Sequence, residues 1–255
     1  MKYRPIVSRA GGKRRLLKYL LPLVPEHTCY VEVFGGGAAL MMGKETSSIE
    51  VYNDLDQELV NLFRQAKYHG KELRRELRMM PGSRAEFSRL LASVPLTEIQ
   101  AAARTLWLNK CSFGGLGKTF GTGKIGGGAS FSSKSGIRHN LEQFEERFDK
   151  VVIECKSWED LLPIYDGPQT FFFFDPPYIN SAKNVGYHPF DAAQMEKLRE
   201  AIDSLKAQWL ITVCDSPECR RIFKGYKLKK ISRMNGIENR RGHSTQYKEL
   251  VITKS

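Results

Sequence analysis

A run of phenylalanines that ends at an acid, two prolines and a tyrosine constrains this chain more than any other feature. Phe171–Phe174 is apolar at every position, which is typical of a buried strand. Pro176 and Pro177 fix φ and lack the backbone donor, so the Pro176 carbonyl can face a ligand. Asp175 adds a second acceptor and Tyr178 a flat aromatic face, which a simple Pro-Pro turn leaves unexplained. We therefore expect a rigid pocket for a planar substrate with an exocyclic amine, such as a nucleobase.

A glycine turn near the amino terminus predicts a cofactor site. Cys29–Phe34 is typical of a buried strand, Gly35–Gly37 follows it, and Ala38–Met42 is typical of a helix. Ile49–Tyr52 then predicts a second strand, and Asp54 follows where a carboxylate can bind ribose hydroxyls. The triplet is not GxGxxG, and alone it fits NAD, FAD or S-adenosylmethionine. This order of elements predicts a doubly wound α/β sheet.

The rest of the chain divides into a helical insertion and a resumed α/β pattern. The pattern is helical over 55–108. Residues 113–131 are rich in glycine, which indicates either a disordered connector or, as we prefer, a segment that orders on a partner. Later segments predict strands at 151–154, 171–174, 209–213 and 250–252, and helices at 191–206 and 216–223. We expect a catalytic domain of residues 1–56 and 145–255, with a target-recognition domain of residues 57–144 inserted into it.

The charge of the chain fits a polyanionic partner, and by itself it fits a merely basic soluble protein equally well. Lys and Arg number 40 against 28 Asp and Glu, a formal charge of +12, and a basic stretch at 220–241 is predicted to meet phosphates. The 5 cysteines include no CxxC pair, so we expect reduced thiols and no metal site. We see no signal sequence and no apolar run that could cross a bilayer. We expect a cytoplasmic, nucleoid-associated protein of a prokaryotic cell, with a phage or prophage gene as an alternative origin.

Several motifs in one order resemble the Dam-type, or α-group, family of DNA adenine-N6 methyltransferases over nearly the full length. The family's AGGK motif corresponds to Ala10–Lys13, its cofactor turn to Val31–Gly37 and its ribose-binding acid to Asn53–Asp54. Its NRxxxNGL segment corresponds to Asn109–Leu116, its catalytic motif to Asp175–Tyr178 and its closing strand to Glu249–Thr253. The resemblance implies a Rossmann-like fold of the S-adenosylmethionine-dependent methyltransferase type. It also implies transfer of a methyl group to N6 of a flipped-out adenine in double-stranded DNA, as in restriction-modification, by a monomer or by a weak dimer on DNA.

The resemblance also assigns roles to matching residues. The catalytic residues would be Asp175, Pro176, Pro177 and Tyr178. The cofactor would be bound by Arg9, Ala10, Gly11, Lys13, Phe34, Gly35, Gly36, Gly37, Asp54, Ser157, Trp158 and Asp175. The DNA would be bound by Asn109, Lys110, Phe113, Lys118, Lys124, Arg138 and Asn140.

The chain departs from the family pattern at positions that matter for specificity. Arg9 replaces the tryptophan that commonly precedes AGGK. In the NRxxxNGL segment Lys110 replaces arginine, Gly114 replaces the second asparagine, and Lys118 stands where a further arginine is expected. Lysine lacks the bidentate fork with which arginine reads guanine. We therefore expect a relaxed specificity, or one that differs from GATC.

Three other functions compete with this one. An RNA or cytosine-N4 methyltransferase is opposed by the acid before Pro176 and by the full order of motifs. A catalytically silent DNA-binding homologue would have a damaged cofactor or catalytic motif, and both look intact here. A nicotinamide dehydrogenase leaves Asp175–Tyr178 unexplained.

Overall fold

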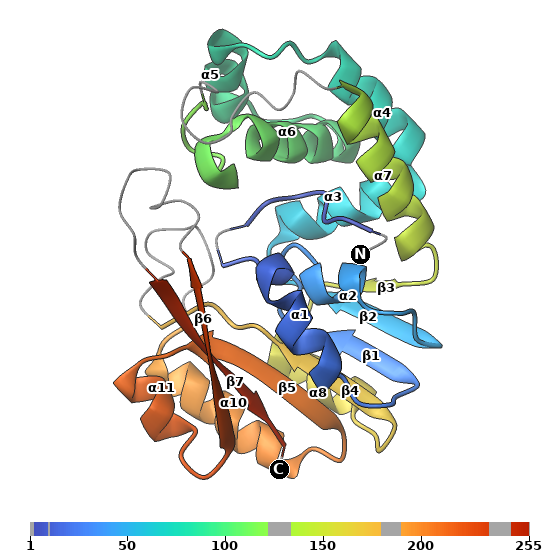
Figure 1. Cartoon of the computed structure of the whole chain (residues 1–255). Coiled ribbons are helices and arrows are strands. Elements are labelled where there is room, and N and C mark those ends of the chain that lie inside the picture. Colours follow the sequence, from blue (N-terminus) through green and yellow to red (C-terminus); the bar gives the residue numbers. More distant parts are fainter. Residues whose placement is uncertain (1–2, 10, 122–133, 180–189, 235–245, 255) are drawn as a thin grey trace. The chain divides into compact units, whose positions relative to one another are not determined.

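The chain forms two compact units, which are described separately below. The computed structural model (Figure 1) describes residues 3–9, 11–121, 134–179, 190–234 and 246–254. The first unit comprises Met1–Leu17, Gly36–Lys44 and Asp56–Ile153, and the second comprises Lys18–Gly35, Glu45–Leu55 and Glu154–Ser255. The boundaries of these units differ from those of the two functional domains expected from the sequence. The division into functional domains stays a prediction.

The second unit is built on a mixed sheet whose strand order is β3-β2-β1-β4-β5-β7-β6. The first four strands of this unit run parallel, and their register pairs Val31 with both Val51 and Phe172, and Phe172 with Trp209. They are β1 (Cys29–Glu32), β2 (Ile49–Asn53), β4 (Thr170–Phe174) and β5 (Gln208–Cys214). β7 (Gln246–Thr253) runs antiparallel to both β5 and β6 (Lys227–Met234), and β3 (Val152–Glu154) spans the boundary between the units.

The parallel strands explain where a site can form. Because β1, β2, β4 and β5 run in one direction, the residues that follow them emerge at the same edge of the sheet. The expected α/β class and mixed sheet are confirmed. One strand, β6, was not predicted, because its sequence was taken only as a basic stretch.

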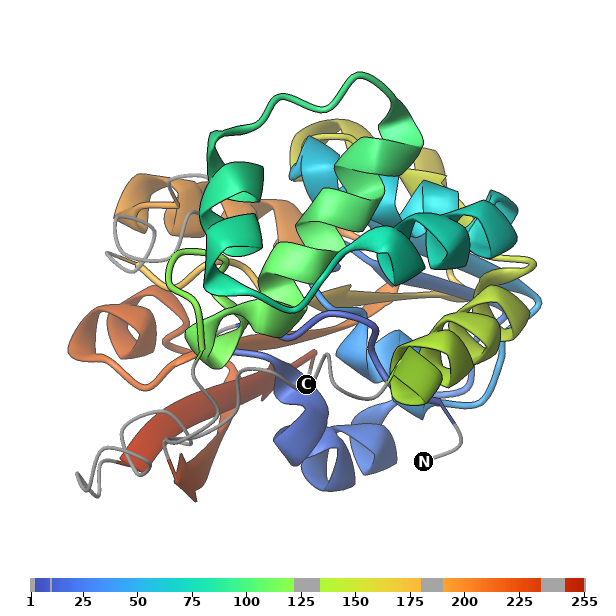
Figure 2. The same cartoon turned by 90° about the horizontal axis from the view of Figure 1, so that it is seen from above.

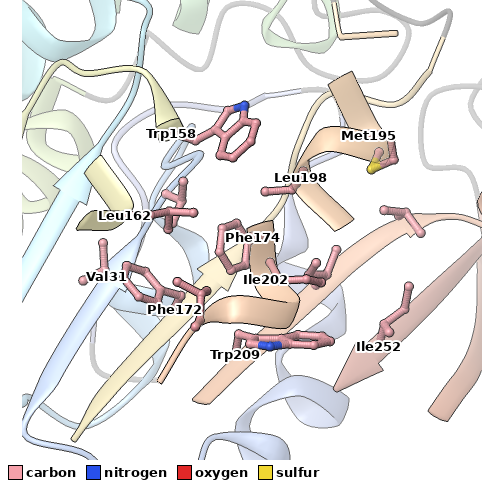
Figure 3. Packing of buried hydrophobic residues seen from close by; sticks show 14 of the residues in the cluster. Val31, Trp158, Leu162, Phe172, Phe174, Met195, Leu198, Ile202, Trp209 and Ile252 are labelled. Atoms are coloured by element: carbon pink, nitrogen blue, oxygen red, sulfur yellow. The ribbon is translucent and has the colours of Figure 1, made fainter. Parts of the chain in front are cut away.

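The phenylalanine run is buried on both faces of β4. Successive side chains of a strand point to opposite faces. Phe172 and Phe174 join the core formed with α8 (Trp158–Tyr165), α10 (Ala192–Ser204) and α11 (Pro217–Ile222). Figure 3 shows the residues that α8 and α10 contribute to this core. On the other face, the Phe171 ring lies 5.4 Å from His27 and 5.9 Å from Tyr30, centroid to centroid. This double burial accounts for a strand with no polar residue.

The helices of the first unit form their own core. α6 (Glu98–Cys111) contacts α3 (Gln57–Tyr68), α4 (Gly70–Met79) and α5 (Arg84–Ala92), and α7 (Lys134–Phe148) contacts α3 and α4 (Figure 2). The Phe144 and Phe148 rings stack with centroids 4.1 Å apart, and the Phe63 ring meets both edge-on. Trp107 of α6 is fully buried in this core.

Side-chain caps set where these helices begin. The N-cap residues Asp56, Ser83 and Thr97 each accept a hydrogen bond from a backbone N–H in the first turn, at α3, α5 and α6 respectively. The amino-terminal segment forms three short turns, η1 (Lys13–Leu16), α1 (Leu17–Leu20) and η2 (Leu21–Leu23), and Pro22 lies in the last of them.

Candidate active site

The expected catalytic residues follow β4 directly. Asp175 is half-buried, Pro176 is buried, and Pro177 and Tyr178 are partly exposed in the irregular segment after Phe174. The register that pairs Phe174 with Ile211 brings Asp175 beside Thr212 of β5. The Thr212 hydroxyl donates a hydrogen bond of 2.9 Å to Asp175 Oδ1.

Thr212 is a site residue that the sequence did not reveal. Its side chain is fully buried, so the hydroxyl orients the carboxylate from within the sheet. A polar residue within the apolar stretch Trp209–Val213 was the available signal. That signal points to Asp175 only once the register of β4 and β5 is known.

Asn53 organises the ends of β1 and β2. This residue is 2% exposed, and its Nδ2 donates to the carbonyls of Val33 at 2.9 Å and Lys156 at 3.0 Å. Its Oδ1 accepts from the Lys156 N–H at 2.9 Å, and its own carbonyl accepts from the Gly35 N–H at 2.7 Å. Asn53 therefore holds three segments together immediately before Asp54, which is half-buried at the same edge of the sheet.

Gly35 lies where no larger residue fits. A Cβ at this position would lie 2.2 Å from Cε2 of Tyr52, whose ring is fully buried. Beside it, the Phe34 ring meets the Phe190 ring edge-on, with centroids 5.5 Å apart. The turn after β1 is thus fixed by packing against β2 and the core of the second unit.

Ser157 and Trp158 have structural roles in the second unit. Ser157 caps α8, because its Oγ accepts a hydrogen bond of 3.1 Å from the Asp160 N–H. Trp158 is 7% exposed and belongs to the hydrophobic core (Figure 3). A contact of these residues with the adenine of a cofactor stays a prediction.

The remaining expected cofactor residues lie in the first unit. The Arg9 guanidinium pairs with the carboxylate of Asp56, the residue that also caps α3. Lys13 is 2% exposed, and its Nζ donates a hydrogen bond of 3.1 Å to the Gly11 carbonyl. Ala10 lies outside the described residues.

The second half of the glycine turn leads into α2 (Ala39–Gly43), also in the first unit. Gly36 has φ of +50°, and a Cβ there would meet no atom within 4 Å. At Gly37 an added Cβ would make only ordinary contacts, the nearest at 3.6 Å from the Val7 carbonyl. Open space beside a backbone of this kind lets a ligand approach closely.

The end of α6 gathers part of the expected DNA-binding set. Asn109 and Lys110 occupy its last turn, Phe113 begins η3 (Phe113–Gly115), and Lys118 is exposed beyond it. Burial lowers the pKa of Lys110 below its ordinary value. Asn109 has a role that the sequence did not reveal, since its amide bonds the backbone of Ser8.

The other expected DNA-binding residues are less completely described. Asn140 is half-buried on α7, and Arg138 lies on the same helix with its side chain outside the described part. Lys124 lies outside the described residues. Asn109, Lys110 and Phe113 thus lie at the end of α6 and the start of η3.

Parts of the basic stretch near the carboxyl terminus are neutralised. Arg220 donates a hydrogen bond of 2.6 Å to Asp215, and Lys230 Nζ lies 3.7 Å from the same carboxylate. The hydrogen bond from Arg220 is the largest reason that the pKa of Asp215 lies below its ordinary value. Arg221 pairs with Glu196 at 2.7 Å. This stretch therefore carries less unpaired charge than its composition indicates.

Two further observations concern the described residues only. All five cysteines are free thiols, as expected. In the ranges that the structure describes, no cluster of three or more His, Cys, Asp or Glu could hold a metal ion, and no helix is long and apolar enough to span a membrane.

The fold and the site together define a class of protein. A parallel sheet with a reversed β7 between β5 and β6, a glycine turn after β1 and an acid-Pro-Pro-Tyr sequence after β4 form a Rossmann-like methyltransferase. The family model described as D12 class N6 adenine-specific DNA methyltransferase matches residues 10–237, so the chain belongs to this family. It is accordingly an enzyme, a DNA adenine methyltransferase.

Relatives cover nearly the whole chain. Type II methyltransferase M1.LlaDCHI of Lactococcus lactis subsp. cremoris is 25% identical, over 98% of this chain and 95% of the relative. Type II methyltransferase M.MjaIII of Methanocaldococcus jannaschii is 22% identical, over 91% of each chain. The DNA adenine methylase of Haemophilus influenzae is 21% identical, over 98% of this chain and 93% of the relative. The expected family is therefore confirmed.

Proposed function

We propose that this enzyme transfers a methyl group from S-adenosylmethionine to N6 of an adenine flipped out of double-stranded DNA. The observation that carries the proposal is the oriented carboxylate of Asp175, followed by the buried Pro176 and by Tyr178, at the end of β4. An adenine within a duplex cannot reach such a pocket. Flipping costs a few kcal/mol, which stacking on Tyr178 partly offsets.

The pocket would activate a poor nucleophile. The lone pair of adenine N6 is delocalised into the ring, so the amine must be drawn toward sp³ geometry before it attacks. The Asp175 carboxylate and the Pro176 carbonyl would each accept one N–H of the amine. Thr212 holds the carboxylate through Oδ1 and so fixes the direction of that acceptor. Positioning of this kind is a major source of catalysis in a displacement reaction.

The residues present fit S-adenosylmethionine, which supplies a methyl carbon made electrophilic by its sulfonium. In the second unit, Asp54 follows β2 where it would accept hydrogen bonds from ribose hydroxyls, and Asn53 holds that strand end in place. In the first unit, the turn at Gly36 and Gly37 leaves the open space that a close backbone contact needs. Arg9, Gly11 and Lys13 would contact the cofactor by resemblance to the family.

The decisive test is incubation of unmodified duplex DNA with a labelled methyl donor, followed by nucleoside analysis. We expect the label in N6-methyldeoxyadenosine alone. Label in N4-methyldeoxycytidine, or in RNA and not in DNA, would identify one of the alternative methyltransferases. DNA binding without any label transfer would identify the silent homologue.

Replacement of Thr212 by valine should slow methyl transfer with little effect on folding. Valine has nearly the shape of threonine but cannot donate to Asp175. A hydrogen bond to a charged group contributes about 1.5–3 kcal/mol, and each 1.36 kcal/mol in the barrier is about tenfold in rate. We expect kcat to fall by about 10- to 100-fold, with the KM for DNA little changed, and Thr212→Ser to recover most of the loss. Steady-state kinetics with wild-type turnover for Thr212→Val would contradict this role.

We further propose that the recognition sequence is relaxed or differs from GATC. Lys110, Gly114 and Lys118 replace the residues with which the family pattern reads bases. The half-buried Lys110, with its lowered pKa, is also a weak substitute for an arginine fork. Methylome sequencing after expression in a methylation-free host should show adenine methylation outside GATC, and modification confined to GATC would refute this.

A further inference from the structure

Asn109 bonds the backbone of a residue far away in the sequence. Its Oδ1 accepts a hydrogen bond of 2.9 Å from the Ser8 N–H. Its Nδ2 donates to the Ser8 carbonyl at 2.7 Å and to the Gly115 carbonyl at 2.7 Å. Both N–H donors of the amide are thus used within the chain, and one side chain holds two separate segments of the first unit.

Gly115 packs directly on the same residue. Its φ is +75°, and a Cβ would lie 2.6 Å from the Ser8 carbonyl oxygen and 2.8 Å from the Ser8 Cβ. Those distances are too short for any side chain, so the loop and the amino-terminal segment touch through their backbones. This contact is independent of the Asn109 hydrogen bonds and points to the same pairing.

The loop itself is closed by Ser112. Its hydroxyl donates to the Asn109 carbonyl at 3.1 Å and accepts from the Gly117 N–H at 2.7 Å. Gly114 and Gly117 also have positive φ, at 65° and 69°. These hydrogen bonds tie the loop to the end of α6, so we expect a displacement of Ser8 to reach the loop.

The two segments lead to different ligands under the proposed function. Ser8 precedes Arg9, Gly11 and Lys13, which would contact the cofactor. Gly115 precedes Lys118 in the segment that would contact DNA. We infer that Asn109 and Gly115 form a joint that couples the binding of the cofactor to the binding of DNA. Asn109 is thus a positioning residue and not a reader of bases.

The coupling has a measurable form. If a bound cofactor orders the Ser8 side of the joint, it raises the affinity for DNA, and DNA raises the affinity for the cofactor by the same factor. Coupling between sites commonly amounts to about 5- to 150-fold. We expect at least about 5-fold for the wild-type enzyme.

The experiment is a binding cycle on the full chain. The Kd for a duplex is measured with and without saturating sinefungin, an unreactive cofactor analogue, and the Kd for sinefungin is measured with and without the duplex. Asn109→Ala and Gly115→Ala should each remove most of the coupling in both directions. Asn109→Asp keeps an acceptor for the Ser8 N–H but places a carboxylate oxygen against the Ser8 and Gly115 carbonyls, so it should lose at least as much coupling as Asn109→Ala.

Two matched controls come from the same unit. Asn61→Ala removes a half-buried amide whose Nδ2 donates to the Glu98 carbonyl at 2.8 Å, away from the joint. Gly82→Ala adds a methyl group where no atom lies within 4 Å and φ is not positive. Both controls should keep wild-type coupling. Thermal unfolding confirms that each variant is folded, and Gly115→Ala carries the test if Asn109→Ala is unstable.

The outcomes separate this inference from the function on which it rests. Failure of the wild type to bind sinefungin or to methylate DNA would overturn the proposed function. A wild type that methylates adenine but shows no coupling between cofactor and DNA binding would overturn only the inference about Asn109 and Gly115. So would an Asn109→Ala variant whose affinity for DNA falls equally with and without sinefungin, because that is the behaviour of a direct DNA contact.

Discussion

Asp175→Ala is expected to lower methyl transfer by at least about 10³-fold, since it removes both an acceptor for the N6 amine and any proton acceptor at the site. The Thr212 hydroxyl holds this carboxylate at the end of β4. DNA binding should survive, because affinity for DNA depends chiefly on contacts with phosphates. The measurement is single-turnover transfer of a labelled methyl group, with DNA affinity measured in parallel.

Two variants sharpen this test. Asp175→Asn keeps one acceptor oxygen without the basicity of a carboxylate. A rate near that of Asp175→Ala would show that proton removal matters, and a rate near wild type would show that orientation of the amine suffices. Asp149→Ala, which removes an exposed carboxylate in the turn after α7, should leave the rate unchanged. Turnover of Asp175→Ala at the wild-type rate would refute the assignment of this pocket.

Local patterns predicted the elements that carry the site. The apolar run Phe171–Phe174 becomes β4 because both faces of that strand are buried, and such burial leaves a signature within a few residues. The glycine turn between β1 and α2, with Asp54 after β2, follows from the same kind of local pattern. Elements that depend on residues close to one another in the sequence could therefore be predicted.

The supporting residues depend on register and could not be predicted. Thr212 reaches Asp175 only because β4 and β5 pair Phe174 with Ile211. Asn53 reaches Lys156, and Asn109 reaches Ser8, across 103 and 101 positions of the chain. A single sequence shows which residues are polar but not which distant backbone they will meet.

Two elements were missed because tertiary packing outweighs local preference. β6 is lysine-rich, and it is the edge strand of the sheet, where lysines discourage pairing with another chain. α8 contains Pro163, which interrupts helical hydrogen bonding, yet Leu161 and Leu162 are buried against the sheet. In both cases the partner element supplies the stability that the local sequence lacks.

Gly35→Ala is expected to destabilise the enzyme strongly. The added methyl group would lie 2.2 Å from Tyr52 Cε2, and the buried ring cannot turn away without displacing the core of the second unit. The Gly35 N–H is also bonded to the Asn53 carbonyl at 2.7 Å, which prevents the turn from retreating. Overpacking costs typically 1–3 kcal/mol, and we expect about 3 kcal/mol here. For a chain of this size that lowers the Tm by about 6–12 °C.

A double-mutant cycle tests whether the Tyr52 ring causes the destabilisation by Gly35→Ala. Tyr52→Phe keeps the ring carbons that the methyl group meets, so it should not rescue Gly35→Ala, whereas Tyr52→Leu removes them and should recover part of the loss. Gly37→Ala is the matched control, because its added Cβ meets nothing closer than 3.6 Å and its φ is not positive. Additive effects of Gly35→Ala and Tyr52→Leu would show that the ring does not limit this position. If Gly35→Ala instead keeps its stability and loses cofactor affinity, the need for glycine lies in the approach of a ligand.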